Sequence, residues 1–251
     1  MKILTWNCNG ALRKKLFALE QFDADILIIQ ECEDPTQSTE AYINWAGDYI
    51  WKGKNKNKGI GIFPKKQHRV KNLNWTGEFF LSGLHSTSPS LKWRSEDLQL
   101  FVPFSINGKI TILAVWTKGR EDQAFGYMGQ FWKYLQIHRS DLASGTTVIL
   151  GDFNSNAQWD KPDRWWSHSD TIVELQKIGL ESAYHMQTGE TQGRESKPTF
   201  FLQRNEGKPY HIDYSFLSSD LLESANLHVG NYQERIKLSD HVPLLLEIHT
   251  Q

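Results

Sequence analysis

The chain has few cysteines and no long apolar run, and each absence removes a class of protein. Its 251 residues include only two cysteines, Cys8 and Cys32, which argues against a disulfide framework and a cysteine metal site; a single bridge between them stays open. No segment approaches the ~20 apolar residues that span a bilayer, and the start "MKILTWNCNG" lacks an export signal. We therefore expect a cytoplasmic protein that does not bind membranes.

The chain also lacks an excess of charge of either sign. The formal net charge of -1 and the pI near 6.8 show no basic excess, so binding of a polyanion would require a local patch. The 39% of hydrophobic residues, with 10 Trp and 13 Phe, are enough for a sizeable core. No linker, repeat or low-complexity tract interrupts the chain. We expect a single domain over residues 1–251, and a monomer.

The apolar periodicity predicts an α/β fold in which helices and strands alternate early and strands dominate late. A turn "NGK" at 107–109 predicts a hairpin, and so antiparallel pairing within the sheet. Helices are expected at 11–22, 122–138 and 169–179. Strands are expected at 2–7, 24–31, 48–52, 59–63, 78–84, 97–106, 109–117, 146–153, 198–203, 211–217, 226–232 and 243–249.

Polar side chains stand where the apolar strands end. "GDFNSN" follows the apolar run 146–150, and strand alternation points Asp152 and Asn154 the same way. A charged group on a core face is costly unless it is paired or holds a metal, although Gly, Asp and Asn also form ordinary turns. Four other strands carry such residues, which together predict a site: Asn7 and Asn9, Gln30 and Glu31, Asp213, and Asp240 with His241.

Six motifs occur in an order that resembles the endonuclease/exonuclease/phosphatase superfamily. They are "WNCNG", "IQE", "NKGIGIF", "GDFN", "HIDY" and "SDH", and they span residues 6 to 241. Each motif alone is weak, whereas the ordered set is specific. The resemblance implies a four-layer α/β sandwich, with two mixed β-sheets packed face to face, helices outside and the site at one edge.

The same resemblance implies a metal-dependent phosphodiesterase. Glu31 and Asp240 would bind the cation with Asn7 nearby, and oxygen ligands of this kind suit Mg²⁺ or Mn²⁺. Asp152 would position or deprotonate the attacking water. Asn154 would hold a phosphate oxygen, with Asn9 completing the neighbourhood on the substrate side. His241 would face the scissile phosphate and be oriented by Asp213, since a neighbouring carboxylate raises the pKa of a histidine.

Structural interpretations of single residues stay open beside these roles. Glu31 could cap a loop, Asp213 could be a buried partner for Arg or Tyr, and His241 could be a satisfied core histidine. Cys8 and Cys32 adjoin site residues, but alternation turns them to the opposite face, so we interpret them as small buried hydrophobes. A further alternative is a scaffold that binds without catalysis; the presence of all the acidic and histidine positions argues against it.

The motifs define the bond to be cleaved and leave the substrate open. Basic and aromatic loops favour nucleic acid, and DNA is the leading expectation, although ordinary solvated loops would have the same composition. Lys52 and Tyr210 are the expected substrate contacts, Tyr210 because related nucleases carry an aromatic residue there. A phospholipid, inositol phosphate or nucleotide is the alternative substrate. The loops in question are "WKGKNKNKG", "PKKQHRVK", "SLKWR" and "AQWDKPDRWW".

One position departs from the family pattern. The strand "ITILAVWTKG" should supply a Tyr or His near the scissile phosphate, and its nearest match is Trp116. An indole N–H can hold a phosphate oxygen but cannot protonate a leaving group. Trp116 is thus either a substrate contact or a core residue, and Thr117 or Lys118 would replace it in the second case.

Overall fold

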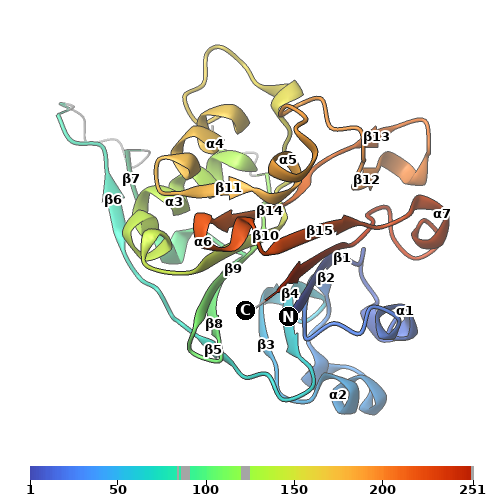
Figure 1. The fold of residues 1–251 in the computed structure, drawn as a ribbon. Coiled ribbons are helices and arrows are strands. Elements are labelled where there is room, and N and C mark those ends of the chain that lie inside the picture. Colours follow the sequence, from blue (N-terminus) through green and yellow to red (C-terminus); the bar gives the residue numbers. More distant parts are fainter. Residues whose placement is uncertain (84, 86–90, 120–124, 250–251) are drawn as a thin grey trace.

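Two six-stranded sheets face each other in the computed structural model, which describes residues 1–83, 85, 91–119 and 125–249 (Figure 1). The β1 sheet has the order β15 (Ala225–Val229), β16 (Leu244–Ile248), β1 (Lys2–Asn7), β2 (Ile26–Cys32), β4 (Lys58–Pro64) and β3 (Ile50–Asn55). The β10 sheet has the order β11 (Leu180–Ser182), β14 (Asp213–Ser218), β10 (Thr147–Asp152), β9 (Ile110–Trp116), β8 (Phe101–Ile106) and β5 (Val70–Asn72).

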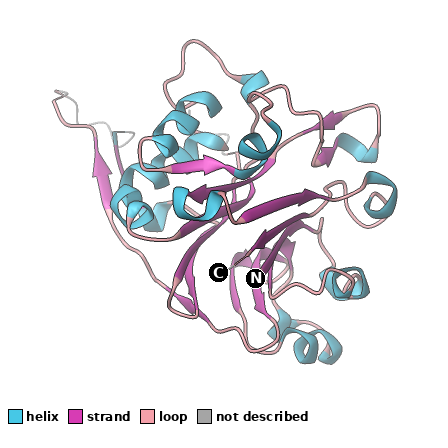
Figure 2. Cartoon of the chain, viewed as in Figure 1, coloured by secondary structure: helices cyan, strands magenta, loops and turns pink. Residues whose placement is uncertain are grey.

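Helices and two small sheets complete the described chain. The small sheets pair β6 (Glu78–Phe80) with β7 (Lys92–Arg94), and β12 (Phe200–Phe201) with β13 (Pro209–Tyr210). The helices are α1 (Phe17–Glu20), α2 (Glu40–Ala46), α3 (Met128–Ala143), α4 (His168–Gln176), α5 (Ala183–Thr188), α6 (Ser219–Leu222) and α7 (Tyr232–Arg235). The helices α1 and α2 cover the outer side of the β1 sheet, and α3 and α4 cover that of the β10 sheet (Figure 2), whereas α5 and α6 contribute side chains to the core between the sheets.

Three apolar cores separate four layers. Ile28 of β2 and Ile112 of β9 belong to the core between the two sheets. Leu113, the next residue of β9, turns to a second core with α3 and α4, because successive strand residues face opposite sides. Leu27 likewise turns to a third core with α1 and α2, which also buries the free thiols of Cys8 and Cys32. The predicted four-layer sandwich is confirmed.

Strand pairing brings the polar strand ends to one edge. β1 and β2 are parallel, with Asn7 opposite Gln30, so both chains reach the same edge. β9 and β10 are also parallel and end together at Asp152. β14 runs antiparallel to β10 and places Asp213 directly opposite Asp152. The sheet register therefore assembles residues that are far apart in the sequence.

Several predicted elements have other bounds in the structure: the helix expected at 122–138 ends at Ala143, the strand expected at 97–106 begins at Phe101 after a 3₁₀ turn, and the strand expected at 226–232 ends at Val229. Two others differ more strongly. The predicted helix 11–22 is a 3₁₀ turn at Leu12–Lys14 followed by the short α1, because the chain enters through a left-handed Ala11 and the Glu33 carboxylate accepts the backbone N–H groups of residues 12 and 13. The predicted strand 198–203 shortens to β12 before a 3₁₀ turn at Leu202–Arg204. Position 84 of one predicted strand and positions 122–124 of one predicted helix lie outside the described residues.

No helix in the described ranges combines the length and apolarity that crossing a membrane requires.

Candidate active site

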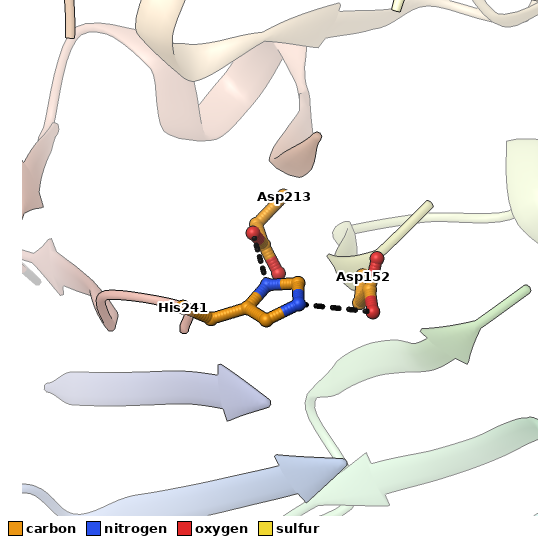
Figure 3. Close-up of side chains that lie close together, drawn as sticks. All are labelled: Asp152, Asp213 and His241. Carbon is orange, nitrogen blue, oxygen red and sulfur yellow. Dashed lines mark hydrogen bonds and ion pairs between the residues drawn. The ribbon is translucent and has the colours of Figure 1, made fainter. Parts of the chain in front are cut away.

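Two aspartates flank one histidine at the shared edge (Figure 3). His241 Nδ1 lies 2.9 Å from Asp213 Oδ2, and His241 Nε2 lies 3.9 Å from Asp152 Oδ2. Asp152 ends β10, Asp213 begins β14, and His241 precedes β16. All three side chains are buried. The structure thus brings together three of the four residues expected to be catalytic.

The His241 imidazole is held from several directions. The Trp6 indole N–H donates to the His241 carbonyl at 3.0 Å, and the His241 backbone N–H donates to Ser239 Oγ at 3.1 Å. Ser239 Oγ in turn donates to the Asn7 carbonyl at 2.7 Å. The Phe200 ring centroid lies 4.7 Å from that of the imidazole. Packing and hydrogen bonds together fix the direction of Nε2, as a site on rigid elements requires.

The environment shifts the pKa values of two of these groups toward neutral pH and above. Burial raises the pKa of Asp152 to about 7, and the charge of Asp213 adds to the rise. Burial acts to lower the pKa of His241, but the carboxylates of Asp213 and Asp152 outweigh it and raise that pKa to about 9. The imidazole is therefore a cation at neutral pH, and Asp152 exchanges its proton near neutral pH.

Asn7 connects the aspartate cluster to Glu31. Its side-chain amide donates to Asp152 Oδ2 at 2.9 Å and to Glu31 Oε1 at 3.4 Å. The Asn7 side-chain oxygen accepts a hydrogen bond from the backbone N–H of Asn9, at 3.0 Å. Two carboxylates consequently converge on one amide nitrogen. The Lys58 ammonium pairs with the other oxygen of Glu31.

The predicted site residues include three non-glycine residues in the left-handed region. Asn9 has a φ of 52°, Glu31 a φ of 61° and Asn154 a φ of 46°. Glu31 also sits in a bulge of β2, where the pairing with β4 shifts register. Left-handed φ values and bulges are costly outside glycine and concentrate at functional sites, where they aim side chains. The backbone itself is shaped for this site.

Asp240 and Asn154 occupy the borders of the cluster. The Asn9 side-chain amide donates to Asp240 Oδ1 at 3.0 Å. The Asn154 backbone N–H donates to Asp152 Oδ1 at 2.9 Å, while its side-chain amide donates to the Thr117 carbonyl at 3.2 Å. These contacts place Asn9, Asp240 and Asn154 at the same edge as the buried trio. Their assigned roles stay predictions.

The donor set fits a hard divalent cation. Glu31 and Asp152 offer carboxylate oxygens on either side of the Asn7 amide, and oxygen ligands are those that Mg²⁺ and Mn²⁺ prefer. Within the described residues, the ligand atoms of Asp152, Asp213 and His241 lie within 4.8 Å of one another, a different set from the expected Glu31, Asp240 and Asn7. A cation at His241 would have to displace the proton that the neighbouring carboxylates favour there, so the Glu31 side of Asn7 is the better cation site.

The expected substrate contacts lie in three different settings. Tyr210 is half-buried in β13, and its ring centroid lies 6.3 Å from that of Phe200. Trp116 is buried in the core between the sheets, with the Lys118 ammonium 3.8 Å from its ring centroid. The Lys52 ammonium donates to the Phe101 carbonyl at 3.1 Å. Tyr210 therefore joins the site through Phe200, whereas the structure does not bring Lys52 to the cluster.

Sequence reasoning missed several residues that shape the site. Lys58 lies in the same lysine-rich segment as Lys52, and only the pairing of β4 with the Glu31 bulge distinguishes them. Thr199 Oγ1 accepts the backbone N–H of Asp213 at 3.0 Å and so positions that aspartate. Phe200 forms an isolated bridge with His241. The segment "PTFF" at 198–201 did not indicate the roles of Thr199 and Phe200, because their partners Asp213 and His241 are distant in the sequence.

A buried aspartate–histidine–aspartate group beside two converging carboxylates thus lies at one edge of a four-layer sandwich. The chain belongs to the endonuclease/exonuclease/phosphatase family, whose sequence model matches residues 4–241. No curated protein matches the chain.

Solved structures show the same fold over whole chains. A 3'-5' exonuclease, NExo, from Neisseria meningitidis is 20% identical with a TM-score of 0.67, and each chain is covered completely. The 3' phosphatase NExo from Neisseria bound to a product DNA hairpin gives the same values. An AP endonuclease from Archaeoglobus fulgidus is 19% identical, with a TM-score of 0.66 and complete coverage of both chains.

Proposed function

We propose that the protein is a divalent-cation-dependent hydrolase of phosphodiester bonds, with DNA as its substrate and Mg²⁺ or Mn²⁺ as its cofactor. The carrying observation is the buried Asp152 placed 3.9 Å from a histidine that Asp213 keeps protonated. An acid–base pair of this kind serves a water attack on an anionic diester and needs no covalent nucleophile.

Each protein group has a task in the reaction. Asp152, with a pKa near 7, accepts a proton from the attacking water. The His241 Nε2–H donates a hydrogen bond to a phosphate oxygen and offsets the charge that develops there, while Asp213 holds Nδ1–H. Asn7 keeps the Asp152 and Glu31 carboxylates together. A cation held by Glu31 and Asp240 would neutralise phosphate charge and stabilise the leaving oxygen.

DNA is favoured over the other substrates of such sites by two kinds of observation. NExo binds a DNA hairpin product, and the Archaeoglobus protein is an AP endonuclease. Aromatic rings and cations also adjoin this centre, namely Phe200 beside His241, Lys58 on Glu31 and Lys118 over Trp116. Cations beside stacking surfaces suit a nucleic acid better than a lipid.

A substrate screen with and without Mg²⁺ tests the proposal. The substrates are single-stranded DNA, duplex DNA, abasic duplex, 3'-phosphorylated DNA, RNA, sphingomyelin and inositol phosphates, with Asp152→Asn as the inactive control. We expect cleavage of at least one DNA substrate that EDTA abolishes and the variant lacks. Turnover on sphingomyelin or inositol phosphates alone would refute DNA as the substrate, and DNA binding without any turnover would favour the scaffold alternative.

A further inference from the structure

A pocket of about 240 Å³ lies beside the candidate active site, along the chain that follows β10. Asn154 forms part of its wall and also donates its backbone N–H to Asp152, so pocket and centre share a residue. The remaining wall comes from 155–168 and from the start of α3. Pockets for drug-sized ligands span about 300–1,000 Å³, so this one suits a single planar group.

Exposed aromatic side chains line this pocket. Trp159 is 46% exposed and Tyr127 is 49% exposed, although both belong to residue types that usually bury most of their surface. Trp166 also lines the pocket and packs so closely on Gly129 that a Cβ there would lie 2.8 Å from the indole. An indole face held open at a pocket rim is a surface on which a ring can stack.

The pocket carries uncompensated positive charge. Its one carboxylate, Asp160, accepts the backbone N–H groups of His168 and Ser169 at 2.8 and 3.0 Å. Lys161 and Arg164 also line it, and across the described parts of the chain neither forms an ion pair. The ligand that fits combines an aromatic ring with an anionic group.

A row of rings joins the pocket to the catalytic histidine. The Trp159 and Tyr210 centroids lie 5.2 Å apart, and those of Tyr210 and Phe200 lie 6.3 Å apart. Phe200 lies 4.7 Å from the His241 ring. A ligand stacked on Trp159 would therefore be continuous with one bound at His241.

We propose that this pocket binds one unpaired nucleotide adjacent to the phosphodiester that is hydrolysed. Its base would stack on Trp159, and its phosphates would contact Lys161 and Arg164. The inference rests on the proposed function and specifies its substrate: bases inside a duplex are covered on both faces, and a pocket of about 240 Å³ admits a single base and not a terminal base pair, so an unpaired nucleotide fits it. Single-stranded or frayed ends are thereby favoured over intact duplex.

The chain contains a matched control for Trp159. Trp165 is 47% exposed but does not line the pocket. In an Asp152→Asn background that prevents turnover, the anisotropy of labelled single-stranded DNA of about ten nucleotides measures Kd, with a blunt hairpin of the same length for comparison. We expect Trp159→Ala to raise Kd for the single strand about tenfold and Trp159→Phe to restore most of the affinity. Trp165→Ala should leave the Kd for the single strand and the Kd for the hairpin within about twofold of those without the replacement.

Specific outcomes would overturn the inference. Equal effects of Trp159→Ala and Trp165→Ala, or equal losses on the single strand and the hairpin, would remove the stacking role. Replacing Lys161 and Arg164 together by Gln should reduce the slope of log Kd against log salt by about 1.4, the value for two phosphate contacts on a single strand. An unchanged slope would remove their phosphate contacts.

Hydrolysis of an abasic (tetrahydrofuran) dinucleotide, a small phosphodiester without a base or any other aromatic ring, separates this inference from the proposed function. The small diester reports the centre alone, so Trp159→Ala in the otherwise wild-type chain should leave its turnover unchanged. If the wild type hydrolyses no phosphodiester while Trp159→Ala still weakens single-strand binding, the proposed function fails and the nucleotide pocket stands. A selective loss of small-diester turnover in Trp159→Ala would contradict a binding role.

Discussion

Two aspartate–histidine pairs in this protein share their geometry and differ in charge. His241 Nδ1 lies 2.9 Å from Asp213, and His138 Nδ1 lies 2.9 Å from Asp141. Both imidazoles are buried. The carboxylates raise the pKa of His241 to about 9, whereas burial lowers the pKa of His138 below its usual value despite the raising effect of Asp141.

The second neighbour of each ring explains the difference. Nε2 of His241 faces the buried carboxylate of Asp152, while Nε2 of His138 lies 2.7 Å from the hydroxyl of Ser95. Asp141 is also 48% exposed at its side chain, so solvent weakens its field. One hydrogen-bonded carboxylate is thus not enough to charge a buried histidine, and two buried ones are.

The largest expected effect separates the two pairs by activity. Asp152→Asn removes the proton acceptor and should lower DNA cleavage about 10²- to 10⁴-fold, the usual contribution of acid–base catalysis. The matched change at the other pair, His138→Gln, should reduce the free energy of unfolding by about 1–3 kcal/mol through an unsatisfied partner, yet leave turnover within about twofold. Steady-state kinetics and urea unfolding measure both. Near wild-type turnover in folded Asp152→Asn would refute its role.

Coupling within the catalytic pair is the next largest effect. His241→Gln and Asp213→Asn should each slow cleavage, and the double variant should cost much less than the sum of the two, because Asp213 acts through His241. The same cycle on His138 and Asp141 should show coupling in stability alone. Strict additivity of the catalytic losses would contradict the pairing.

Stability should depend on pH differently at the two histidines. Without divalent cations, folded His241 keeps its proton to about pH 9, whereas an unfolded histidine loses it near 6.5. The folded state binds more protons between these values, so its contribution falls as pH rises, by at most about 1.4 kcal/mol per pH unit.

Urea unfolding of wild type and His241→Gln at pH 6.5 and 9 measures that contribution as a difference between variants. The difference in the free energy of unfolding between wild type and His241→Gln should shrink toward pH 9. Because the pKa of His138 is lowered, the stability that His138 contributes is lost as pH falls below 6.5. The difference in the free energy of unfolding between wild type and His138→Gln should therefore stay constant from pH 6.5 to 9. A difference that stays constant for His241→Gln would show that His241 is not a cation in the folded protein.

The smallest effect comes from giving His138 a second carboxylate. Ser95→Asp places an acid where the hydroxyl now lies 2.7 Å from Nε2, and it should raise the pKa of His138 by about one unit. NMR titration of the imidazole measures the shift, and Ser95→Asn is the neutral control. DNA cleavage should not slow, since His138 and Asp141 lie on α3 and outside the group formed by Asp152, Asp213 and His241. An unshifted pKa would refute the two-carboxylate explanation.

Local patterning was sufficient to predict where most strands lie and which residues end them. β1 covers residues 2–7 as expected, because its short apolar run is a property of adjacent residues. The helix expected at 11–22 failed, since Glu33 and the left-handed Ala11 reshape that segment from outside its own pattern. Lys52 was chosen over Lys58 for the same reason: the composition of a lysine-rich hairpin does not say which ammonium meets Glu31.

The sequence by itself determined the family and the polar residues at the strand ends, since motif order and the apolar strand runs are encoded along the chain, and the family resemblance implied the four-layer architecture. Tertiary structure alone decided what those residues are to one another. Asn7 meets Asp152 across 145 positions, and Asp213 meets His241 across 28. The charge on His241 depends on burial and on two carboxylates brought together by sheet register, and burial and register arise only when distant strands pack.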